Sequence, residues 1–425
     1  MSKICVIGLG YIGLPTSALF AKYGHEVVGV DINPKIVETI NSGNIHIEET
    51  GLAELVKEVV SNGNLRASTA PEVSDAYIIA VPTPIYSDYT ANVDYVISAT
   101  ESITNILKKG DTVIVESTIP PRTTDDIVKP ILEKAGFNVG EDIYLAHCPE
   151  RVLPGRILHE LIHNTRIVGG INEQSTNKAA EVYQLVVKGE ILKTSALTAE
   201  MSKLMENTFR DVNIALANEL VKICNRLGIN AHEVISYANK HPRVNLHYPG
   251  PGVGGHCLAV DPYFIIEKAA EESILIKTAR EINNSMPSYV VNQVNYLVSE
   301  LENPTISIFG LAYKGNVDDI RESPAVEIFH LLRENKNFNL KVFDPHVDQS
   351  QTSIPLSSFE DAIKDSNLVL ILTDHNEFKN MNFDQLKNLM ATPYIFDTRN
   401  CIEPNDESGV KVMKLGNLSN VQTIQ

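Results

Sequence analysis

The sequence predicts an α/β fold in which two doubly wound sheets are joined by a central helical segment with a long helix. Three observations support this prediction. In the first third of the chain, short β-branched runs alternate with amphipathic stretches, and this alternation returns after Pro304. Between about Thr198 and Gly228 it gives way to one long helical pattern. Strands that alternate with helices indicate parallel sheets, because parallel strands need a crossover connection.

The expected elements follow in order along the chain. The first domain should contain strands at residues 3–8, 25–31, 75–84, 111–118 and 142–150. The central helix is predicted from apolar residues at helical spacing, namely Met201, Met205, Val212, Leu216, Leu220 and Ile223. The last domain should contain strands within residues 305–315, 339–345, 367–374 and 392–400. Because 425 residues are too many for one compact core, we expect three domains, residues 1–195, 196–300 and 301–425.

Composition and charge limit the function classes. A formal net charge of −17 argues against a general nucleic-acid or anionic-membrane surface, because either would need a basic face. The apolar runs are far shorter than a bilayer span, and the apolar N-terminal segment lacks the small-residue cleavage site of a signal peptide. The five cysteines form neither a C-x-x-C pair nor a metal-ligand spacing. We therefore expect a cytoplasmic protein with free thiols and no bound metal.

The stretch "VIGLGYIG" indicates a dinucleotide site. Gly8, Gly10 and Gly13 form G-x-G-x-x-G directly after a strand and before a helical pattern, and Asp31 follows the next strand. The glycines allow a pyrophosphate to approach a helix N-terminus. Asp31 would bind both ribose hydroxyls and repel a 2′-phosphate, so NAD is expected rather than NADP, with Lys35 nearby. The alternative is a related domain that no longer binds a dinucleotide.

The two ends of the chain share a pattern. "VIGLG…VVGVDIN" and "IFGLA…KVFDPH" both contain a strand, a glycine turn, a helix, a second strand and an acid. Both domains are therefore predicted to be Rossmann-like.

Polar residues follow several predicted strands of the first domain. Thr83 in "VPTP", Thr118 in "EST" and Glu150 in "HCPERVLPG" fall where loops at the carboxyl edge of a parallel sheet contact ligands. Each of them could equally be a capping or turn residue.

One face of the central helix is polar. Lys203, Asn207 and Arg210 lie at i, i+4 and i+7, and Asn213 and Asn218 follow. Such a face is usually only solvated, but the mixture of a lysine with amides is more typical of a site wall. A lysine beside a reacting hydroxyl could relay its proton or stabilise an alkoxide.

The loop "PGPGVGGHC", residues 249–257, ends in Cys257, and Asp261 follows four residues later. Four glycines and two prolines predict a shaped loop rather than a helix or strand. Beside a nicotinamide site, a thiolate could trap an aldehyde as a thiohemiacetal, whose oxidation gives a thioester that water hydrolyses. The alternative is a surface turn with a small apolar cysteine behind it.

Three cations follow predicted strands of the last domain: Lys314, Arg321 and Arg399. Cations at such an edge suit phosphates or carboxylates, although surface charge is the alternative.

Taken in order, "GLGYIG", "VPTP", "EST", "CPERVLPG", "AEMSKLMENTFRDVNIALANEL", "HPRVN", "PGPGVGGHC" and "GLAYKGNVDDIRESPA" resemble the UDP-glucose/GDP-mannose dehydrogenase family over nearly the whole chain. "HPRVN…PGPGVGGHCLAVDP" is similar to the branch that acts on 2-acetamido sugars. The resemblance implies NAD as cofactor and four-electron oxidation of C6 of a UDP-sugar, with UDP-N-acetyl-D-mannosamine as the expected substrate. It also implies a homodimer or higher homo-oligomer.

The resemblance assigns roles by matching motif. The implied catalytic residues are Cys257 as nucleophile, Lys203 as acid/base, Asn207 and Asp261 as assisting groups, Glu150 as a further acid, and Thr118. The implied substrate contacts, which also include Lys203 and Asn207, are Arg151, Val152, Arg210, His241, Arg243, Gly254, Lys314 and Arg399. Arg243 would reach the neighbouring subunit's site. The implied cofactor contacts are Gly8, Gly10, Tyr11, Ile12, Gly13, Asp31, Lys35, Thr83, Thr118 and Arg321.

Three alternatives stay open. The same chemistry could act on UDP-N-acetylglucosamine or UDP-glucose. A two-electron hydroxyacid dehydrogenase would also place a lysine and an asparagine one helical turn apart after a dinucleotide domain, but it leaves the Cys257 loop unexplained. A non-catalytic nucleotide-sugar sensor would bind both ligands without producing NADH.

Overall fold

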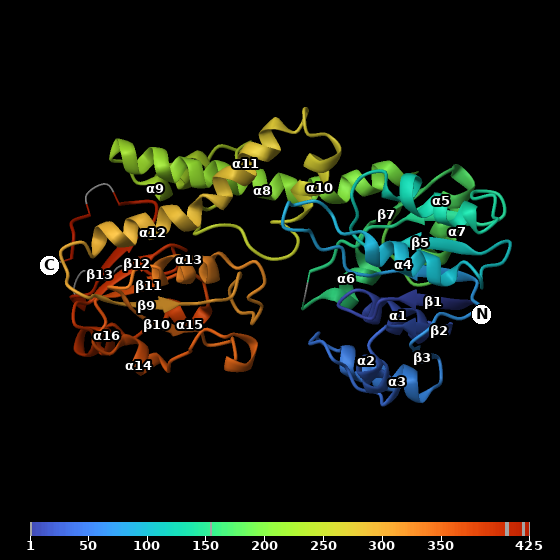
Figure 1. The fold of residues 1–425 in the computed structure, drawn as a ribbon, viewed down its shortest axis with the longest axis horizontal. Helices are drawn as coiled ribbons and strands as arrows, with labels where there is room; N and C mark the ends of the chain where they lie inside the picture. The colour runs from blue at the N-terminus through green and yellow to red at the C-terminus, as the bar shows by residue number, and fades with distance from the viewer. Residues whose placement is uncertain (1, 154, 404–407, 419–420, 425) are drawn as a thin grey trace. The chain divides into compact units, whose positions relative to one another are not determined.

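The computed structural model describes residues 2–153, 155–403, 408–418 and 421–424. These residues form an eight-stranded and a five-stranded sheet, with helices on both sides of each sheet (Figure 1). The predicted α/β class is confirmed. The chain divides into two compact units, Met1–Glu206 with Tyr263–Ala270, and Asn207–Pro262 with Glu271–Gln425. The long central helix α8, Ala196–Leu227, contributes residues to both units.

The first sheet has the strand order β3-β2-β1-β4-β5-β6-β7-β8. Its strands are β1 (Lys3–Ile7), β2 (Glu26–Val30), β3 (Leu65–Ser68), β4 (Ala76–Ile79), β5 (Thr112–Val115), β6 (Tyr144–His147), β7 (Arg166–Gly170) and β8 (Ile191–Ser195). All neighbours are parallel except β6 and β7. The five strands expected here are present, whereas β3, β7 and β8 were not predicted.

Helices cover both faces of this sheet. They are α1 (Gly13–Lys22), α2 (Pro34–Asn41), α3 (Leu52–Ser61), α4 (Asp94–Ile103), α5 (Lys129–Lys134), α6 (Ile157–His163), α7 (Glu173–Gln184) and the π-helical turn η1 (Thr124–Val128). Ile4 and Val6 of β1 belong to one apolar core, and Cys5 and Ile7 belong to another. A strand buried on both faces needs a continuous apolar run, which explains why β1 was readily predicted.

The second sheet is parallel throughout, with the order β10-β9-β11-β12-β13. Its strands are β9 (Thr305–Phe309), β10 (Asn339–Phe343), β11 (Leu368–Ile371), β12 (Tyr394–Asp397) and β13 (Lys411–Lys414). The remaining helices are α9 (Ala231–Ala238), α10 (Asp261–Lys268), α11 (Ile274–Asn284), α12 (Met286–Leu297), α13 (Pro324–Arg333), η2 (Gln349–Gln351), α14 (Phe359–Ile363), α15 (Asn376–Lys379) and α16 (Phe383–Leu389). Four of these strands were predicted, and β13 was not.

The internal repeat has a structural counterpart in the turns after β1 and β9. The N–H of Gly8 donates to the carbonyl oxygen of Val30 (2.8 Å), and that of Gly310 donates to the carbonyl oxygen of Phe343 (2.9 Å). Both glycines have a positive φ, +96° and +90°. The two sheets therefore begin with the same strand, glycine turn and second strand, as expected for two Rossmann-like folds.

Helix α8 ends at Leu227, immediately before the predicted stop at Gly228. In the second unit this helix differs from an ordinary surface helix, because three of its polar residues are buried: Asn207, Asp211 and Asn218. Several of the exposed positions are apolar, namely Phe209 (60%), Leu216 (48%), Ile223 (48%) and Leu227 (65%), and the charged residues Arg210, Glu219 and Arg226 are exposed as well. In the part of the chain that the structure describes, no helix combines the length and the apolar character needed to cross a membrane.

Candidate active site

The turn after β1 is shaped by glycine. A Cβ at Gly8 would lie 2.5 Å from the carbonyl oxygen of Ala80, and a Cβ at Gly13 would lie 1.7 Å from the carbonyl oxygen of Gly8. A Cβ at Gly10, in contrast, would meet no atom within 4 Å. Gly8 and Gly13 are thus required by the packing of the turn, and Gly10 leaves its outer face open. The turn leads into the N-terminus of α1, whose dipole favours an anion such as pyrophosphate.

Asp31 follows β2 and ties this turn to the second strand. Its Oδ2 accepts a hydrogen bond from the N–H of Leu9 (3.2 Å), and its Oδ1 accepts one from the N–H of Asn33 (2.9 Å). A carboxylate has about four acceptor positions, so Asp31 can still bind two ribose hydroxyls. These residues fit the pyrophosphate and adenosine ribose of NAD. The other predicted contacts in this region are two exposed residues and one half-buried residue: Tyr11, Lys35 and Ile12.

The loops after β4 and β5 meet at the carboxyl edge of the sheet. The hydroxyl of Thr83 donates to the carbonyl oxygen of Thr118, and the hydroxyl of Ser117 donates to the carbonyl oxygen of Val81 (2.7 Å). The structure therefore brings the two predicted threonines together.

Glu150 belongs to a buried cluster that the sequence did not predict. Nη2 of Arg166 lies 2.9 Å from Oε2 of Glu150, and its Nη1 lies 3.2 Å from Oε1 of Glu116. The hydroxyl of Tyr183 donates to the same oxygen of Glu116 (2.8 Å). One buried cation thus joins the ends of β5 and β6. No local pattern marks Arg166, because its partners lie 16 and 50 residues away in the sequence.

Arg151 lies beside the segment of α8 that carries Lys203. Its Nη1 donates to the carbonyl oxygen of Thr165 (3.0 Å), and its Nη2 pairs with Oε1 of Glu206 (2.6 Å). Lys203 is half-buried and lies three residues before Glu206, so both occupy one face of α8. Val152, the other predicted residue of this loop, is half-buried against the first core.

Glu200 connects the start of α8 to the loop after β5, and sequence reasoning missed it. Its buried carboxylate accepts hydrogen bonds from the N–H of Arg122 (2.6 Å) and from the N–H (2.9 Å) and hydroxyl (2.6 Å) of Thr124. Burial raises the pKa of Glu200, although these hydrogen bonds oppose the rise. Nothing in the local sequence distinguishes Glu200 from an ordinary exposed glutamate of a helix, so its contacts with the loop after β5 could not be predicted.

Residues 249–257 form a loop, as predicted. The loop lies close to residues 310–324 of the same unit. The N–H of Gly255 donates to the carbonyl oxygen of Arg321 (3.3 Å), and a Cβ at Gly254 would lie 2.5 Å from the carbonyl oxygen of Glu322. Glycine is required at position 254 because any side chain would meet backbone.

Cys257 is exposed at the end of this loop. Its carbonyl oxygen accepts the N–H of Asp261 (2.9 Å), so the cysteine lies in the turn that leads into α10. The side chains of Asn207 and Asp261 are buried and joined by a hydrogen bond of 2.6 Å from Nδ2 to Oδ2. The structure therefore brings together two residues that were predicted separately.

A buried polar network anchors the other end of the loop. The N–H of Gly250 donates to Asn218 (2.9 Å), whose amide donates to Asn283 of α11 (2.9 Å). Asn283 in turn donates to Asp211 (2.8 Å), which also accepts a bond from Arg280 (2.6 Å). Burial raises the pKa of Asp211, and the Arg280 charge opposes the rise. The polar face of α8 is thus partly a structural network that positions the Cys257 loop.

The three predicted cations lie at the carboxyl edge of the second sheet. Lys314 is exposed, Arg321 pairs with Asp319 (2.6 Å), and Arg399 pairs with Asp374 (3.1 Å). The remaining predicted substrate contacts, Arg210, His241 and Arg243, are exposed. Glu150, Arg151, Val152 and Lys203 belong to the first unit, and Asn207, Gly254, Cys257 and Asp261 belong to the second.

A glycine turn bonded to an acid on one Rossmann-like sheet, and a glycine loop that ends in a cysteine beside a second such sheet, are the features expected of a nicotinamide-dependent dehydrogenase of the nucleotide-sugar class. Family models match nearly the whole chain: the NAD binding domain at residues 2–187, the central domain at 197–285 and the UDP binding domain at 307–404. The chain belongs to the UDP-glucose/GDP-mannose dehydrogenase family and is an NAD-dependent UDP-sugar dehydrogenase.

Relatives support this assignment. UDP-N-acetyl-D-mannosamine dehydrogenase of Methanococcus maripaludis is 48% identical over 98% of this chain and 97% of its own length. The solved UDP-N-acetyl-mannosamine dehydrogenase of Staphylococcus aureus is 54% identical, with a TM-score of 0.92 over 99% of this chain and 100% of its own. NDP-N-acetyl-D-galactosaminuronic acid dehydrogenase of Ralstonia solanacearum is 45% identical over 93% of this chain and 95% of its own length.

The buried cluster predicts a pH-dependent stability. Burial raises the pKa of Glu116 to about 7, from 4.5 in the unfolded chain, while the Arg166 charge opposes the rise and the Glu150 charge adds to it. The folded protein therefore binds more protons than the unfolded chain between these pH values, and this contribution to stability is lost as pH rises through the window. Glu116→Gln removes the titrating group, so this pH-dependent loss of stability should disappear.

We expect the wild type to lose up to about 3 kcal/mol of unfolding free energy relative to Glu116→Gln as the pH rises from 4.5 to 7, because one pKa unit corresponds to about 1.4 kcal/mol. The unfolding free energies of both proteins are measured by urea denaturation. Glu181→Gln, in the exposed pair with Lys178, is the control and should follow the wild-type curve. Parallel curves for Glu116→Gln and wild type would contradict the assignment.

Proposed function

We propose that this protein oxidises the C6 hydroxyl of UDP-N-acetyl-D-mannosamine to the carboxylate of UDP-N-acetyl-D-mannosaminuronate, in the cytoplasm. The observation that carries the proposal is the exposed Cys257, at the end of a glycine loop that lies against residues 310–324 of the UDP binding domain. The choice of sugar rests on relatives named for UDP-N-acetyl-D-mannosamine.

The reaction removes four electrons: RCH2OH + 2 NAD⁺ + H2O gives RCOO⁻ + 2 NADH + 3 H⁺. The C6 alcohol first loses its O–H proton and a hydride, for which bound NAD⁺ would be the acceptor, and becomes an aldehyde. The thiolate of Cys257 then attacks C6, forming a C–S bond while the carbonyl electron pair moves to oxygen. Oxidation of this thiohemiacetal gives a thioester. Water then attacks the thioester, the C–S bond breaks, and the thiolate is regenerated. The aldehyde stays bound because the sulfur holds it between the two oxidations.

Other residues move protons and stabilise charge. Lys203 accepts the proton of the C6 hydroxyl, and the amide of Asn207 donates to the oxyanion. Asp261, already hydrogen-bonded to Asn207, orients that amide and the attacking water. Glu150 provides a further carboxylate.

The nucleotides are held by separate groups. When bound, NAD would supply the hydride acceptor for both oxidations. On the first unit, the glycine turn, Asp31 and the Thr83–Thr118 loops hold it, joined by Tyr11, Ile12 and Lys35. Lys314 and Arg399 pair with the diphosphate of the UDP-sugar, Arg321 contacts the cofactor, and the remaining contacts surround the sugar: Arg151, Val152, Arg210, His241, Arg243 and Gly254.

The first test is an endpoint titration of NADH. Limiting UDP-ManNAc, UDP-GlcNAc, UDP-GalNAc or UDP-glucose is incubated with excess NAD⁺, and NADH is counted per sugar consumed. We expect two NADH from UDP-ManNAc and little from the others. Two NADH from another sugar would preserve the mechanism but replace the substrate, with UDP-GalNAc included because one relative is named for galactosaminuronic acid. One NADH would indicate a two-electron dehydrogenase, and none would indicate a sensor.

Cys257→Ala should separate the two oxidations. Without the thiol no thioester forms, so the rate of uronate production should fall by about 10³-fold or more. Cys401→Ser is the matched control: burial raises the pKa of Cys401 to about 12, so this thiol stays protonated, and its replacement should change the rate less than about twofold. Uronate production by Cys257→Ala at near the wild-type rate would rule out the thioester route.

We also propose that the protein works as a homodimer through the exposed apolar face of α8, with Arg243 reaching the partner's site. A contiguous exposed apolar stripe is typical of a protein interface. Leu216→Glu should convert a particle of about twice 46.9 kDa into one of 46.9 kDa in light scattering. Val73→Glu, at another exposed apolar residue, should leave the mass unchanged. A wild-type monomer, or a dimeric Leu216→Glu variant, would contradict this proposal.

A further inference from the structure

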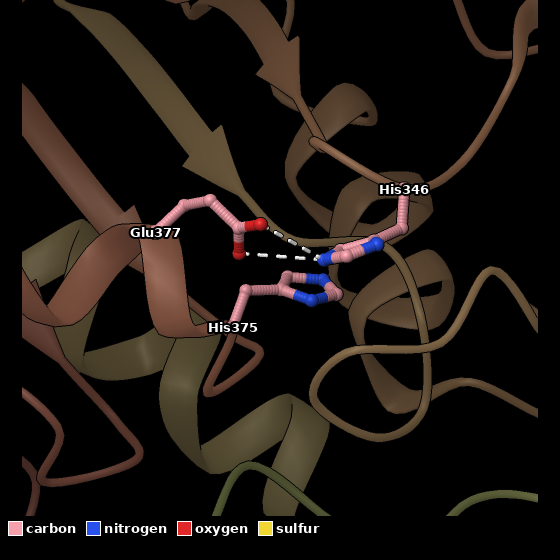
Figure 2. Close-up of side chains that lie close together, drawn as sticks. All are labelled: His346, His375 and Glu377. Carbon is pink, nitrogen blue, oxygen red and sulfur yellow. Dashed lines mark hydrogen bonds and ion pairs between the residues drawn. The ribbon is translucent and has the colours of Figure 1, made fainter. Parts of the chain in front are cut away.

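Two histidines and a glutamate gather beside the carboxyl ends of β10 and β11 (Figure 2). Nε2 of His346 lies 3.3 Å from Oε1 of Glu377, and the imidazoles of His346 and His375 stack with their centroids 4.8 Å apart and an interplanar angle of 30°. His375 is completely buried. Imidazole and carboxylate are common metal ligands, so the chemistry of this cluster has to be decided from its hydrogen bonds.

His375 has no lone pair left for a metal. Its Nδ1 lies 2.9 Å from the backbone N–H of Asn316, which can only donate, so Nδ1 must be the acceptor. The proton of the neutral ring is then on Nε2, which donates to Oδ2 of Asp344 (3.2 Å). Stacked rings also direct their nitrogen lone pairs along nearly parallel planes rather than toward one ion. This arrangement describes a fixed tautomer that joins two loops.

The residues around His375 hold the loop that contains Lys314. The hydroxyl of Thr373 donates to the carbonyl oxygen of Ala312 (2.7 Å), and the N–H of Asn376 donates to Oδ1 of Asn316 (2.9 Å). Asn316 has a φ of +61°, a left-handed conformation that asparagine adopts more readily than most residues. Residues 373–376 thus contact both ends of the 312–316 loop.

The same segment also reaches the second cation and the end of β10. Asp374 pairs with Arg399 (3.1 Å), and a Cβ at Gly315 would lie 2.6 Å from the carbonyl oxygen of Asp374. Asp344, the partner of His375, accepts the N–H groups of Leu311 (2.7 Å) and Ala312 (3.2 Å) at the start of the loop. His375 is therefore the one side chain of this segment that connects Asp344 directly to Asn316.

We propose that His375 is a positioning residue for UDP: by joining Asp344 to Asn316, it fixes the 311–316 loop so that Lys314, together with Arg399, can bind the diphosphate. This inference rests on the proposed roles of Lys314 and Arg399. The ring contacts neither the nucleotide nor a metal and acts through the backbone of the loop.

The test measures UDP binding by isothermal titration calorimetry, which needs no turnover. His375→Phe keeps an aromatic ring but removes both hydrogen bonds. We expect UDP to bind about tenfold more weakly, because part of the binding free energy must then be used to order the 311–316 loop. The affinity for NAD⁺ should not change. His375→Gln keeps a donor for Asp344 and should recover part of the affinity. His346→Ala, the control, should bind UDP within about twofold of wild type.

Two further measurements keep the test decisive. The ¹⁵N spectrum of the wild-type imidazoles should show His375 as the Nε2–H tautomer, a result that needs no folded variant. After incubation with Zn²⁺, elemental analysis should find the same zinc content in the wild type as in His346→Ala and His375→Phe. Tight UDP binding by His375→Phe, the other tautomer, or one additional zinc per wild-type chain would each overturn the inference. Failure of the wild type itself to bind UDP would instead refute the proposed function on which it rests.

Discussion

The hydrogen bond from the turn after the first strand to the acid after the second strand is the interaction on which both units depend. In the first unit the N–H of Leu9 donates to Asp31, and in the second the N–H of Leu311 donates to Asp344. This bond fixes the direction of the glycine turn and therefore the edge of the sheet at which ligands can bind. The loops that contain Thr83 and Thr118, and those that contain Lys314 and Arg399, lie at the carboxyl edges of their sheets because the strands that precede them are parallel.

The two acids have different surroundings, although they occupy equivalent positions in the two sheets. Asp31 is half-buried and accepts hydrogen bonds from two backbone N–H groups, which leaves capacity for a ribose. Asp344 is buried and also bonded to His346, Val347 and His375. Burial raises the pKa of Asp344, but these hydrogen bonds outweigh it and lower the pKa to about 2. An acid saturated in this way organises a loop instead of binding a sugar.

The elements that could be predicted from sequence are those determined by residues close together in the chain, and the missed ones depend on contacts between distant residues. Strands buried on both faces, such as β1 and β4, are continuous apolar runs and were predicted. The four-residue strand β3 and the edge strands β8 and β13 expose part of their side chains, so no such run marks them. The glycine turn and the Cys257 loop were predictable because local backbone geometry requires glycine. Arg166 was not, because its carboxylate partners become neighbours only when the sheet forms.

Helix α8 shows why a polar face can be misjudged from sequence. Its amides suggested a site wall, but Asn218 is buried, donates a hydrogen bond to Asn283 and accepts one from the N–H of Gly250. Leaving a buried amide without a hydrogen-bond partner costs about 1–3 kcal/mol of folding free energy. The network therefore favours the one loop arrangement in which Gly250, Asn218 and Asn283 are all hydrogen-bonded. The loop that ends in Cys257 therefore starts from a fixed point. In the proposed mechanism, the thiol of Cys257 would hold one carbon through two oxidations, and a fixed loop would keep that carbon in the same place for both.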